Sequence, residues 1–156
     1  MQGKGKAICL PADIDTDVII AGRYLRTKDR SVWAEHVFED LDQALAKNLK
    51  GAIIVTGKNF GCGSSREQAA IALKEAGVVA VVAPSFARIF FRNAINIGLP
   101  LIEAEVPCAN GRLVTFDLNA GWVDTGTGRH KIAPLSLKML AILKAGGLVA
   151  YWKVKK

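Results

Sequence analysis

The sequence has no long apolar segment and few cysteines, and these shortages exclude several classes of protein. No run of residues is long and apolar enough to cross a bilayer, so a membrane-spanning protein is not expected. Residues 1–6 lack the apolar core of a signal peptide, which favours a cytoplasmic location. The 3 cysteines, Cys9, Cys62 and Cys108, are widely spaced and odd in number, which argues against the disulfide framework of a secreted protein.

Metal-binding residues are also scarce. No two cysteines have the Cys-x-x-Cys spacing, and the 2 histidines, His36 and His130, lie far apart in the sequence. A metal or iron–sulfur site built by this chain alone is therefore not expected.

The formal net charge is +7, but much of it lies near the two ends of the chain. The terminal contributors are Lys4, Lys6, Lys153, Lys155 and Lys156. A solvated periphery accounts for them. No basic patch is interleaved with the aromatic residues that stack on bases, so nucleic acid is not an expected partner. A non-catalytic anion-binding or RNA-binding module stays open as an alternative class. Arginines near the glycine-rich loops favour a small anionic ligand.

The length and the order of apolar segments predict one α/β domain over residues 1–156. The clearest segments alternate between strands and helices, which predicts a parallel β-α-β-α-β core with right-handed crossovers. They are a strand at 52–55, a helix at 65–76, a strand at 78–83, a helix at 86–97 and a strand at 99–102. In the second of these helices Ile89 is expected on the inner face.

The remaining segments are shorter. An opening strand is expected at 6–10, and short helical patterns follow at 32–38 and 41–46. Additional short strands are expected at 113–116, 121–123 and 130–132. A C-terminal helix is expected at 135–143, with Leu137, Leu140 and Ala141 facing inward, and one more turn of helix at 148–152.

The segment from Gly57 to Arg66 carries the strongest chemical signal. It joins an expected strand to an expected helix, and in open parallel sheets ligands bind at this end of the strands. Its glycines allow close approach of a ligand to the backbone. Ser64 or Ser65 stands where the helix N-cap is expected, and the free N–H groups of a helix start attract anions. The planar donor fork of Arg66 suits a carboxylate.

The pattern differs from a nucleotide-binding loop. A Walker A motif needs a second glycine where this chain has Cys62, and it needs a lysine before the serine. A carboxylate ligand therefore fits better. The structural alternative is that Ser64 only caps a helix, which is worth about 1 kcal/mol, and that Arg66 only forms a surface ion pair. Cys62 is interpreted as a small residue of a tight loop, because no suitably spaced histidine supports it as a nucleophile.

Three further polar groups leave alternatives open. The alternating Asp13, Asp15 and Asp17 could hold a metal, but turn and cap chemistry is the preferred interpretation of the first two. Asp17 stays a candidate because its carboxylate could orient an arginine or a serine. The basic segment 23–27 either grips a ligand or is an ordinary exposed connection. A further pair, Arg88 and Arg92, lies one helical turn apart and faces either solvent, a subunit or a ligand.

Three motifs, taken in order, resemble one known family. Residues 15–19, 57–67 and 85–100 are similar to the swivel domain of aconitase. The match is to its short stand-alone form, the small subunit of the 3-isopropylmalate dehydratase and homoaconitase type. The resemblance covers the chain from about residue 4 to 150, and the Gly-Ser-Ser-Arg-Glu stretch at 63–67 is highly specific.

The resemblance implies a hydro-lyase that is active only with a large subunit, as a heterodimer or heterotetramer. That partner would carry a [4Fe–4S] cluster acting as a Lewis acid, and none would be bound by this chain. The substrate would be a small di- or tricarboxylate. The first expectation is isomerisation of 2-isopropylmalate and 3-isopropylmalate in leucine biosynthesis. Homoaconitase, in a lysine or related chain-elongation pathway, and a dimethylmalate-type dehydratase are the alternatives.

The resemblance also implies roles for individual residues. Ser64 would be the catalytic base, and Asp17 matches the family's active-site aspartate. Carboxylate binding would fall to Gly63, Ser65, Arg66 and Arg26. The segment Tyr24, Leu25, Arg26 and Thr27 would be the loop that selects among substrates. Either Arg26 pairs with a distal carboxylate of homocitrate-type substrates, or it holds a shared carboxylate while Leu25 meets an isopropyl group.

Overall fold

The fold is organised around a seven-stranded sheet. The computed structural model describes residues 1–155, so Lys156 of the expected domain lies outside the described residues. The strand order is β4-β3-β2-β1-β5-β6-β7. The strands are β1 (Gln2–Leu10), β2 (Ala52–Thr56), β3 (Ala80–Ala83), β4 (Leu101–Glu103), β5 (Leu113–Asp117), β6 (Trp122–Asp124) and β7 (Arg129–Lys131). The helices are α1 (Thr16–Ile19), α2 (Arg30–Glu35), α3 (Glu67–Glu75), α4 (Arg88–Asn96), α5 (Leu137–Ala145) and α6 (Leu148–Lys155), with 3-10 turns η1 (Gly22–Tyr24) and η2 (Leu45–Asn48).

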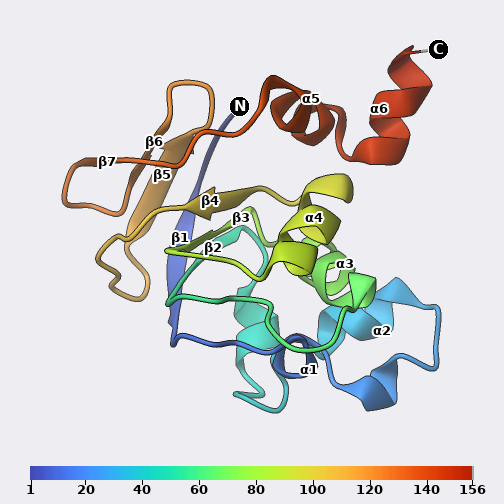
Figure 1. Ribbon diagram of the computed structural model, residues 1–156. Helices are drawn as coiled ribbons and strands as arrows, with labels where there is room; N and C mark the ends of the chain where they lie inside the picture. The colour runs from blue at the N-terminus through green and yellow to red at the C-terminus, as the bar shows by residue number, and fades with distance from the viewer. Residues whose placement is uncertain (156) are drawn as a thin grey trace.

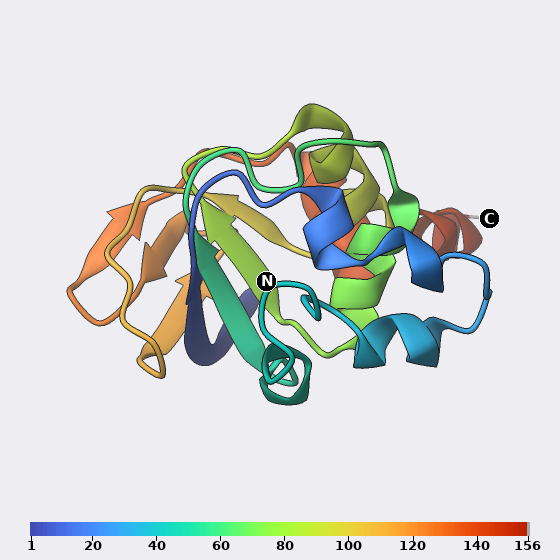
Figure 2. The same cartoon turned by 90° about the horizontal axis from the view of Figure 1, so that it is seen from below.

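The predicted parallel core is present as β2-α3-β3-α4-β4. The strands β1 to β4 pair in parallel, and β5 to β7 continue the sheet in antiparallel fashion. Figures 1 and 2 show α1 to α4 beside the parallel strands, and β5 to β7 on the side of the molecule away from these helices. The expected fold class is confirmed, with two C-terminal helices where one was expected together with a further turn.

The opening strand β1 is longer than expected and lies in the middle of the sheet. Its predicted part, from residue 6, pairs with β2, whereas residues 2–6 pair with β5. Residues 2–5 were not predicted as strand, because they are polar and contain two glycines. Gly5 is needed there, because a Cβ at that position would lie 2.4 Å from the backbone oxygen of Gly51.

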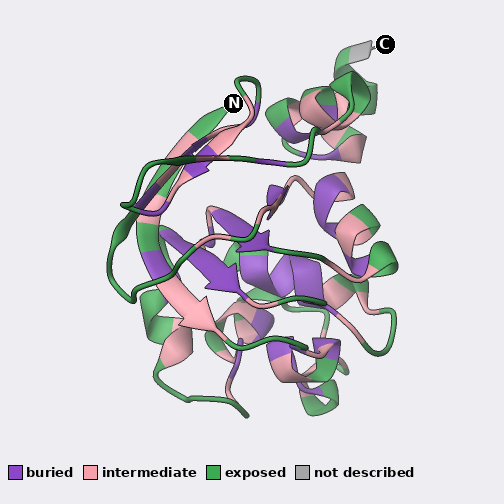
Figure 3. Cartoon of the chain, turned by 60° about the vertical axis from the view of Figure 1, so that its left-hand side comes forward, coloured by how far each residue is buried: buried purple, intermediate pink, exposed green. Residues whose placement is uncertain are grey.

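The central strands are buried on both faces, which explains their continuous apolar sequences. All residues of β2 and β3 are buried. Ile54 and Val81 pack into a core with α1 to α4, and Ile53 and Val82 pack into a second core that includes α5. Figure 3 shows the buried residues gathered in these strands and in the helix faces beside them.

Three predicted inner positions are wrong. Ile89 is 52% exposed because the buried face of the first turn of α4 carries Phe90 instead. Leu137 is 86% exposed and Ala141 is also exposed, because the buried face of α5 carries Ile142 and Leu143. None of the helices described over 1–155 is long and apolar enough to span a membrane.

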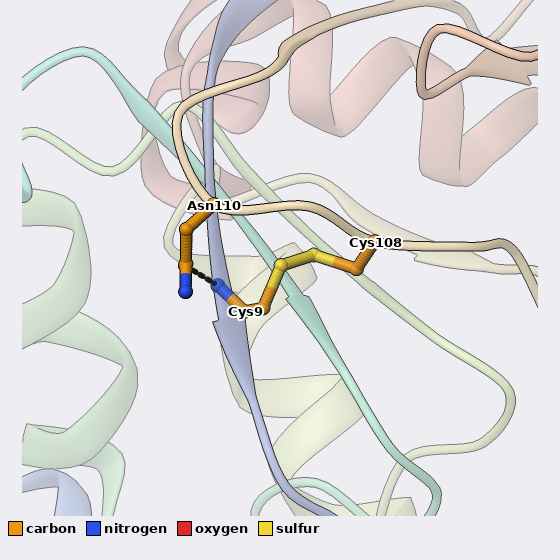
Figure 4. The surroundings of a disulfide bond; sticks show 3 residues. All are labelled: Cys9, Cys108 and Asn110. Carbon is orange, nitrogen blue, oxygen red and sulfur yellow. Dashed lines mark hydrogen bonds between the residues drawn. A yellow bond between two sulfur atoms is a disulfide. The ribbon is translucent and has the colours of Figure 1, made fainter.

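A disulfide joins Cys9 to Cys108 across 99 residues of sequence, where the cysteine spacing had argued against a disulfide framework. The two residues are neighbours because the segment before β5 runs along β1. Cys9 N donates to Asn110 Oδ1 at 2.8 Å (Figure 4). Ala7 N donates to Arg112 O at 2.8 Å. Separation along the chain therefore did not predict separation in space, and the result is one crosslink rather than a framework.

Candidate active site

The loops that follow β1, β2 and β3 meet at the carboxyl edge of the parallel strands. Gly61 N donates to Ile14 O at 2.8 Å, which joins the second loop to the first. Ala87 N donates to Phe60 O at 3.0 Å, which joins the third loop to the second. The three loops thus form one surface at the sheet edge where ligands bind in parallel α/β folds.

Thr16 fixes the backbone beside Ser64. It is only 2% exposed, its N–H donates to Cys62 O at 2.8 Å, and its hydroxyl donates to Ser64 O at 2.8 Å. Asp15 caps the short helix α1 by accepting from Asp17 N at 2.7 Å, as the cap interpretation predicted. No role was predicted for Thr16, although it stands inside the motif at 15–19.

Two glycines of the second loop occupy positions that no other residue could fill. Gly61 has φ 84° and Gly63 has φ 90°, a conformation that L side chains rarely adopt. A Cβ on Gly61 would lie 2.2 Å from Cγ of Phe90, and a Cβ on Gly63 would lie 2.3 Å from Oδ2 of Asp15. The loop can therefore pack against the first and third loops only because these side chains are absent.

A cavity of about 260 Å³ opens at this edge. Its lining residues are Thr16, Gly61, Gly63, Ser64, Ser65, Arg66, Ala87, Arg88, Ile89 and Phe90. The structure thus brings together the predicted set Gly63 to Arg66. It adds the first turn of α4, including Arg88, whose orientation the sequence left open.

The serines do not cap α3, which corrects the expected N-cap. The helix begins at Glu67, and its N-cap residue is Arg66, which makes no side-chain cap hydrogen bond. The reason is that Arg66 is extended, with φ −132° and ψ 106°, so the helix starts later than its apolar pattern indicated. The hydroxyl of Ser64 is therefore not engaged in capping this helix.

Asp17 and Arg66 form an ion pair beside the cavity. Arg66 Nη1 lies 2.5 Å from Asp17 Oδ1, and their side chains are 23% and 55% exposed. Nη1 is buried and has no aligned hydrogen-bond partner among the described residues. A Cβ on Gly22 would lie 3.5 Å from the same nitrogen, so η1 also borders the guanidinium. Of the two partners that the sequence left open for Asp17, an arginine or a serine, the structure pairs it with the arginine.

The segment 23–27, which begins within η1, is held in place by acidic residues of the segment after α2. Arg23 Nη2 pairs with Asp40 Oδ1 at 2.7 Å, and the Tyr24 hydroxyl donates to Glu39 at 2.7 Å. This hydrogen bond raises the pKa of Tyr24. It is also the main reason that the pKa of Glu39 is lowered, followed by hydrogen bonds from His36 and Arg23. Arg23 and Tyr24 therefore serve to position the segment.

Arg26 differs from these anchored residues. Its side chain is exposed, and it takes part in no ion pair within the described part of the chain. Residues 24–27 do not line the cavity; the loop reaches the site only through Gly22 beside Arg66. The charge of Arg26 is thus free to meet a ligand or a partner chain.

Cys62 and Asp13 are explained by loop structure. Burial raises the pKa of the Cys62 thiol, and the carboxylates of Asp15 and Asp13 raise it further, which opposes formation of a nucleophilic thiolate. Asp13 has φ 59° and accepts from Asn59 Nδ2 at 3.1 Å, which agrees with its predicted turn role. Among residues 1–155, no group of three or more His, Cys, Asp or Glu side chains is placed to hold a metal.

The fold and the site define an α/β protein with a cavity, lined by two serines and two arginines, at the carboxyl edge of its parallel strands. Residues 9–105 match the family described as the Aconitase C-terminal domain. The chain therefore belongs to this family, as its motifs had indicated.

Known relatives span nearly the whole chain. The methanogen homoaconitase small subunit of Methanothermobacter thermautotrophicus is 52% identical, with 97% of this chain and 92% of that protein covered. The 3-isopropylmalate dehydratase small subunit of Pyrobaculum neutrophilum is 51% identical, with 98% of each chain covered. The crystal structure of 3-isopropylmalate dehydratase from Methanocaldococcus jannaschii has a TM-score of 0.90 at 46% identity, covering 99% of this chain and 95% of that one.

Proposed function

We propose that this chain is the small subunit of a heteromeric hydro-lyase that interconverts 2-isopropylmalate and 3-isopropylmalate by dehydration and rehydration, in leucine biosynthesis. The observation that carries the proposal is the cavity of about 260 Å³ in which Ser64, Ser65 and Arg66 lie together. The names of the relatives at about this chain's full length support the same reaction class. We also propose a cytoplasmic location.

In the proposed reaction, Ser64 removes a proton from the carbon next to a carboxylate. A serine hydroxyl becomes a base only where charge and preorganised donors stabilise its alkoxide. Arg66 supplies positive charge in the same cavity, and Thr16 holds the Ser64 backbone at 2.8 Å. Loss of the hydroxyl from the neighbouring carbon gives an enoic diacid, and return of water in the opposite sense gives the isomer.

The carboxylate next to the reacting carbon is assigned to Arg66, together with Ser65 and the backbone of Gly63. Asp17 acts in this proposal as a positioning residue, because its carboxylate lies 2.5 Å from Arg66 Nη1 and orients the donor fork. The resemblance implies an active-site role for this aspartate, and we propose that it fills that role through Arg66.

The large subunit completes the proposed enzyme. The described residues offer no site for an iron–sulfur cluster, so we propose that the partner carries a [4Fe–4S] cluster. When bound, such a cluster supplies a Lewis acid for the departing hydroxyl. The assembly would be a heterodimer or a heterotetramer.

A second candidate function is that of a homoaconitase small subunit. One observation favours it: Arg26 is exposed and free of ion pairs among the described residues, whereas its neighbour Arg23 is engaged with Asp40. An available guanidinium suits the additional carboxylate of a homoaconitate-type substrate. A relative at 52% identity that is named a homoaconitase small subunit agrees with this alternative.

The test compares the chain alone with the chain assembled with its large subunit. We expect no turnover from the purified chain and dehydration of 3-isopropylmalate to the enoic diacid by the assembled enzyme. Full activity of the isolated chain would contradict the proposal that the active site is shared between this chain and the large subunit. Rates on 3-isopropylmalate and homoaconitate then rank the two substrates, and Arg26→Val should change their ratio. Lys28→Ala is the matched control, because Lys28 is another exposed cation of the same segment.

A further inference from the structure

Arg88 lies in the same cavity as the proposed base. It comes from the first turn of α4, whereas Ser64 and Arg66 come from the loop before α3. The cavity is therefore bordered by two arginines from different elements. The residue types at its wall are hydroxyl, backbone, apolar and guanidinium groups, and no acidic side chain lines it among the described residues.

The two arginines differ in whether their charge is already paired with a carboxylate of the protein. Arg66 is already paired with Asp17 at 2.5 Å. Arg88 is exposed and belongs to no ion pair of residues 1–155. A ligand with two carboxylates that enters this cavity loses water from both, and each buried carboxylate needs a charged or hydrogen-bonding partner. Arg66 alone supplies one such fork.

The start of α4 adds donors on the same side. The helix has nine residues, its N-cap Ala87 makes no side-chain cap hydrogen bond, and its first turn contains no acidic residue. The N-cap and first turn, residues 87–90, line the cavity. Ala87 N donates to Phe60 O, but the backbone N–H groups of residues 88–90 have no acceptor within the helix. These groups and the positive end of the helix dipole therefore reinforce the charge of Arg88.

We infer that Arg88 binds the second carboxylate of the substrate, the one away from the carbon that Ser64 deprotonates. This inference rests on the proposed function and extends it. Arg88 would then select for ligands with two carboxylates, while Arg66 holds the carboxylate at the reacting carbon. An apolar side chain of the substrate would meet Ile89 and Phe90 between them.

The chain offers a matched control on the same helix. Arg92 lies one turn after Arg88 and, with Arg88, lines a separate groove of about 350 Å³ between α4 and α5, but it does not line the cavity. A defect that arises in the groove would appear in variants of both residues. A defect that arises in the cavity would appear only in Arg88 variants.

The experiment uses the enzyme assembled with its large subunit. We expect Arg88→Gln to raise KM for 3-isopropylmalate roughly ten- to hundredfold, with a smaller change in kcat, because a charge-assisted hydrogen bond is lost. Arg88→Lys should recover part of the loss, and Arg92→Gln should leave KM within about twofold. Equal effects of Arg88→Gln and Arg92→Gln would overturn the inference.

A substrate analogue separates binding from a merely structural role. The monomethyl ester at the carboxylate away from the reacting carbon lacks the group that Arg88 is inferred to bind. Wild-type enzyme should turn it over with a KM raised by a similar factor, and Arg88→Gln should add little further loss. A full additional loss on the ester would show that Arg88 acts only through the structure.

Failure of the proposed function would be recognised separately, as absence of turnover by the wild-type assembly. The inference is then tested on the chain itself by titration with malate, a simple dicarboxylate. NMR signals of the Arg66 and Arg88 Nε–H groups should both shift in the wild type, and Arg88→Gln should weaken binding. A shift confined to Arg66 would overturn the inference.

Discussion

The parallel strands β1 to β4 and the antiparallel strands β5 to β7 belong to one sheet, but their connections differ. In the parallel part, the segments that leave β1, β2 and β3 gather at one edge and form the cavity. In the antiparallel part, short turns join neighbouring strands, and the disulfide ties the preceding segment to β1. Parallel connections thus concentrate loop ends where a ligand can bind, whereas the antiparallel extension covers and braces β1.

The largest expected effect lies in the parallel part. Ser64→Ala should lower kcat of the assembled enzyme by about 10²- to 10⁴-fold, because a general base is removed. Steady-state kinetics measures this loss, and size-exclusion chromatography with the large subunit checks that assembly is kept. Ser65→Ala is the neighbouring control and should act mainly on KM. Near-normal turnover of Ser64→Ala would move the base to another residue.

Loss of the disulfide should affect stability and leave chemistry nearly unchanged. The bond closes a segment of 99 residues, so its removal should lower the free energy of unfolding by about 2–4 kcal/mol. Urea unfolding with and without reductant measures the change, and kcat should stay within about twofold.

The control for this comparison is the double variant Cys9→Ser with Cys108→Ser, whose unfolding midpoint should not respond to reductant. Equal midpoints for the oxidised and reduced wild-type chain would show that the crosslink adds nothing. Titration of free thiols in protein taken rapidly from cells would report whether the bond exists there, since cytosolic thiols are usually kept reduced.

A smaller effect is expected where the first loop supports the second. Thr16→Val keeps the shape of the side chain but removes the hydroxyl that donates to Ser64 O. We expect a loss of about 1 kcal/mol in stability and a fall of kcat, because the loop that carries the base becomes less fixed. Thr16→Ser should restore both properties, measured by thermal unfolding and kinetics. If valine and serine behave alike, the hydroxyl has no positioning role.

The smallest effect concerns the contacts that hold residues 23–27 in place, in particular the hydrogen bond from Tyr24 to Glu39. Hydrogen bonds, first of all from Tyr24, lower the pKa of Glu39 below its usual 4.5. A lowered carboxyl pKa stabilises the folded form above pH 4.5, and this contribution is lost as the pH falls through the folded value. The indole N–H signal of Trp33, which donates to Tyr24 O, should change over that acid range.

The variant Glu39→Gln should remove this titration, and Glu35→Gln, an exposed carboxylate variant nearby, should leave it intact. A Trp33 signal that titrates unchanged in Glu39→Gln would assign the transition to another group.

The buried part of the fold could be read from the sequence because its strands are apolar on both faces. The segments 52–55, 78–83 and 99–102 contain strands at the predicted places. Residues 2–5 could not be recognised as a strand from their own sequence, because they are polar and contain glycines. They are a strand because they pair with β5, which lies more than a hundred residues later in the chain. The Cys9–Cys108 bond was missed for the same reason: the contact depends on the path of the chain.

The candidate site was predictable where one continuous segment carries it. Gly63 to Arg66 line the cavity, and the ion pair of Asp17 with Arg66 fits the idea that this carboxylate orients an arginine. The contribution of Arg88 was not predictable, because a helix start reaches the cavity only through the approach of the third loop to the second. The catalytic and substrate-binding roles themselves stay predictions.

The central place of β1 also bears on the order of folding. This strand precedes both of its neighbours in the chain, yet β2 begins at residue 52 and β5 at residue 113. Its two hydrogen-bonding edges are therefore satisfied at different times, and the second only by a contact between residues about a hundred positions apart. Such distant pairings slow folding and leave an open strand edge during it. Closure by β5 is thus the step at which competition from other chains would be greatest.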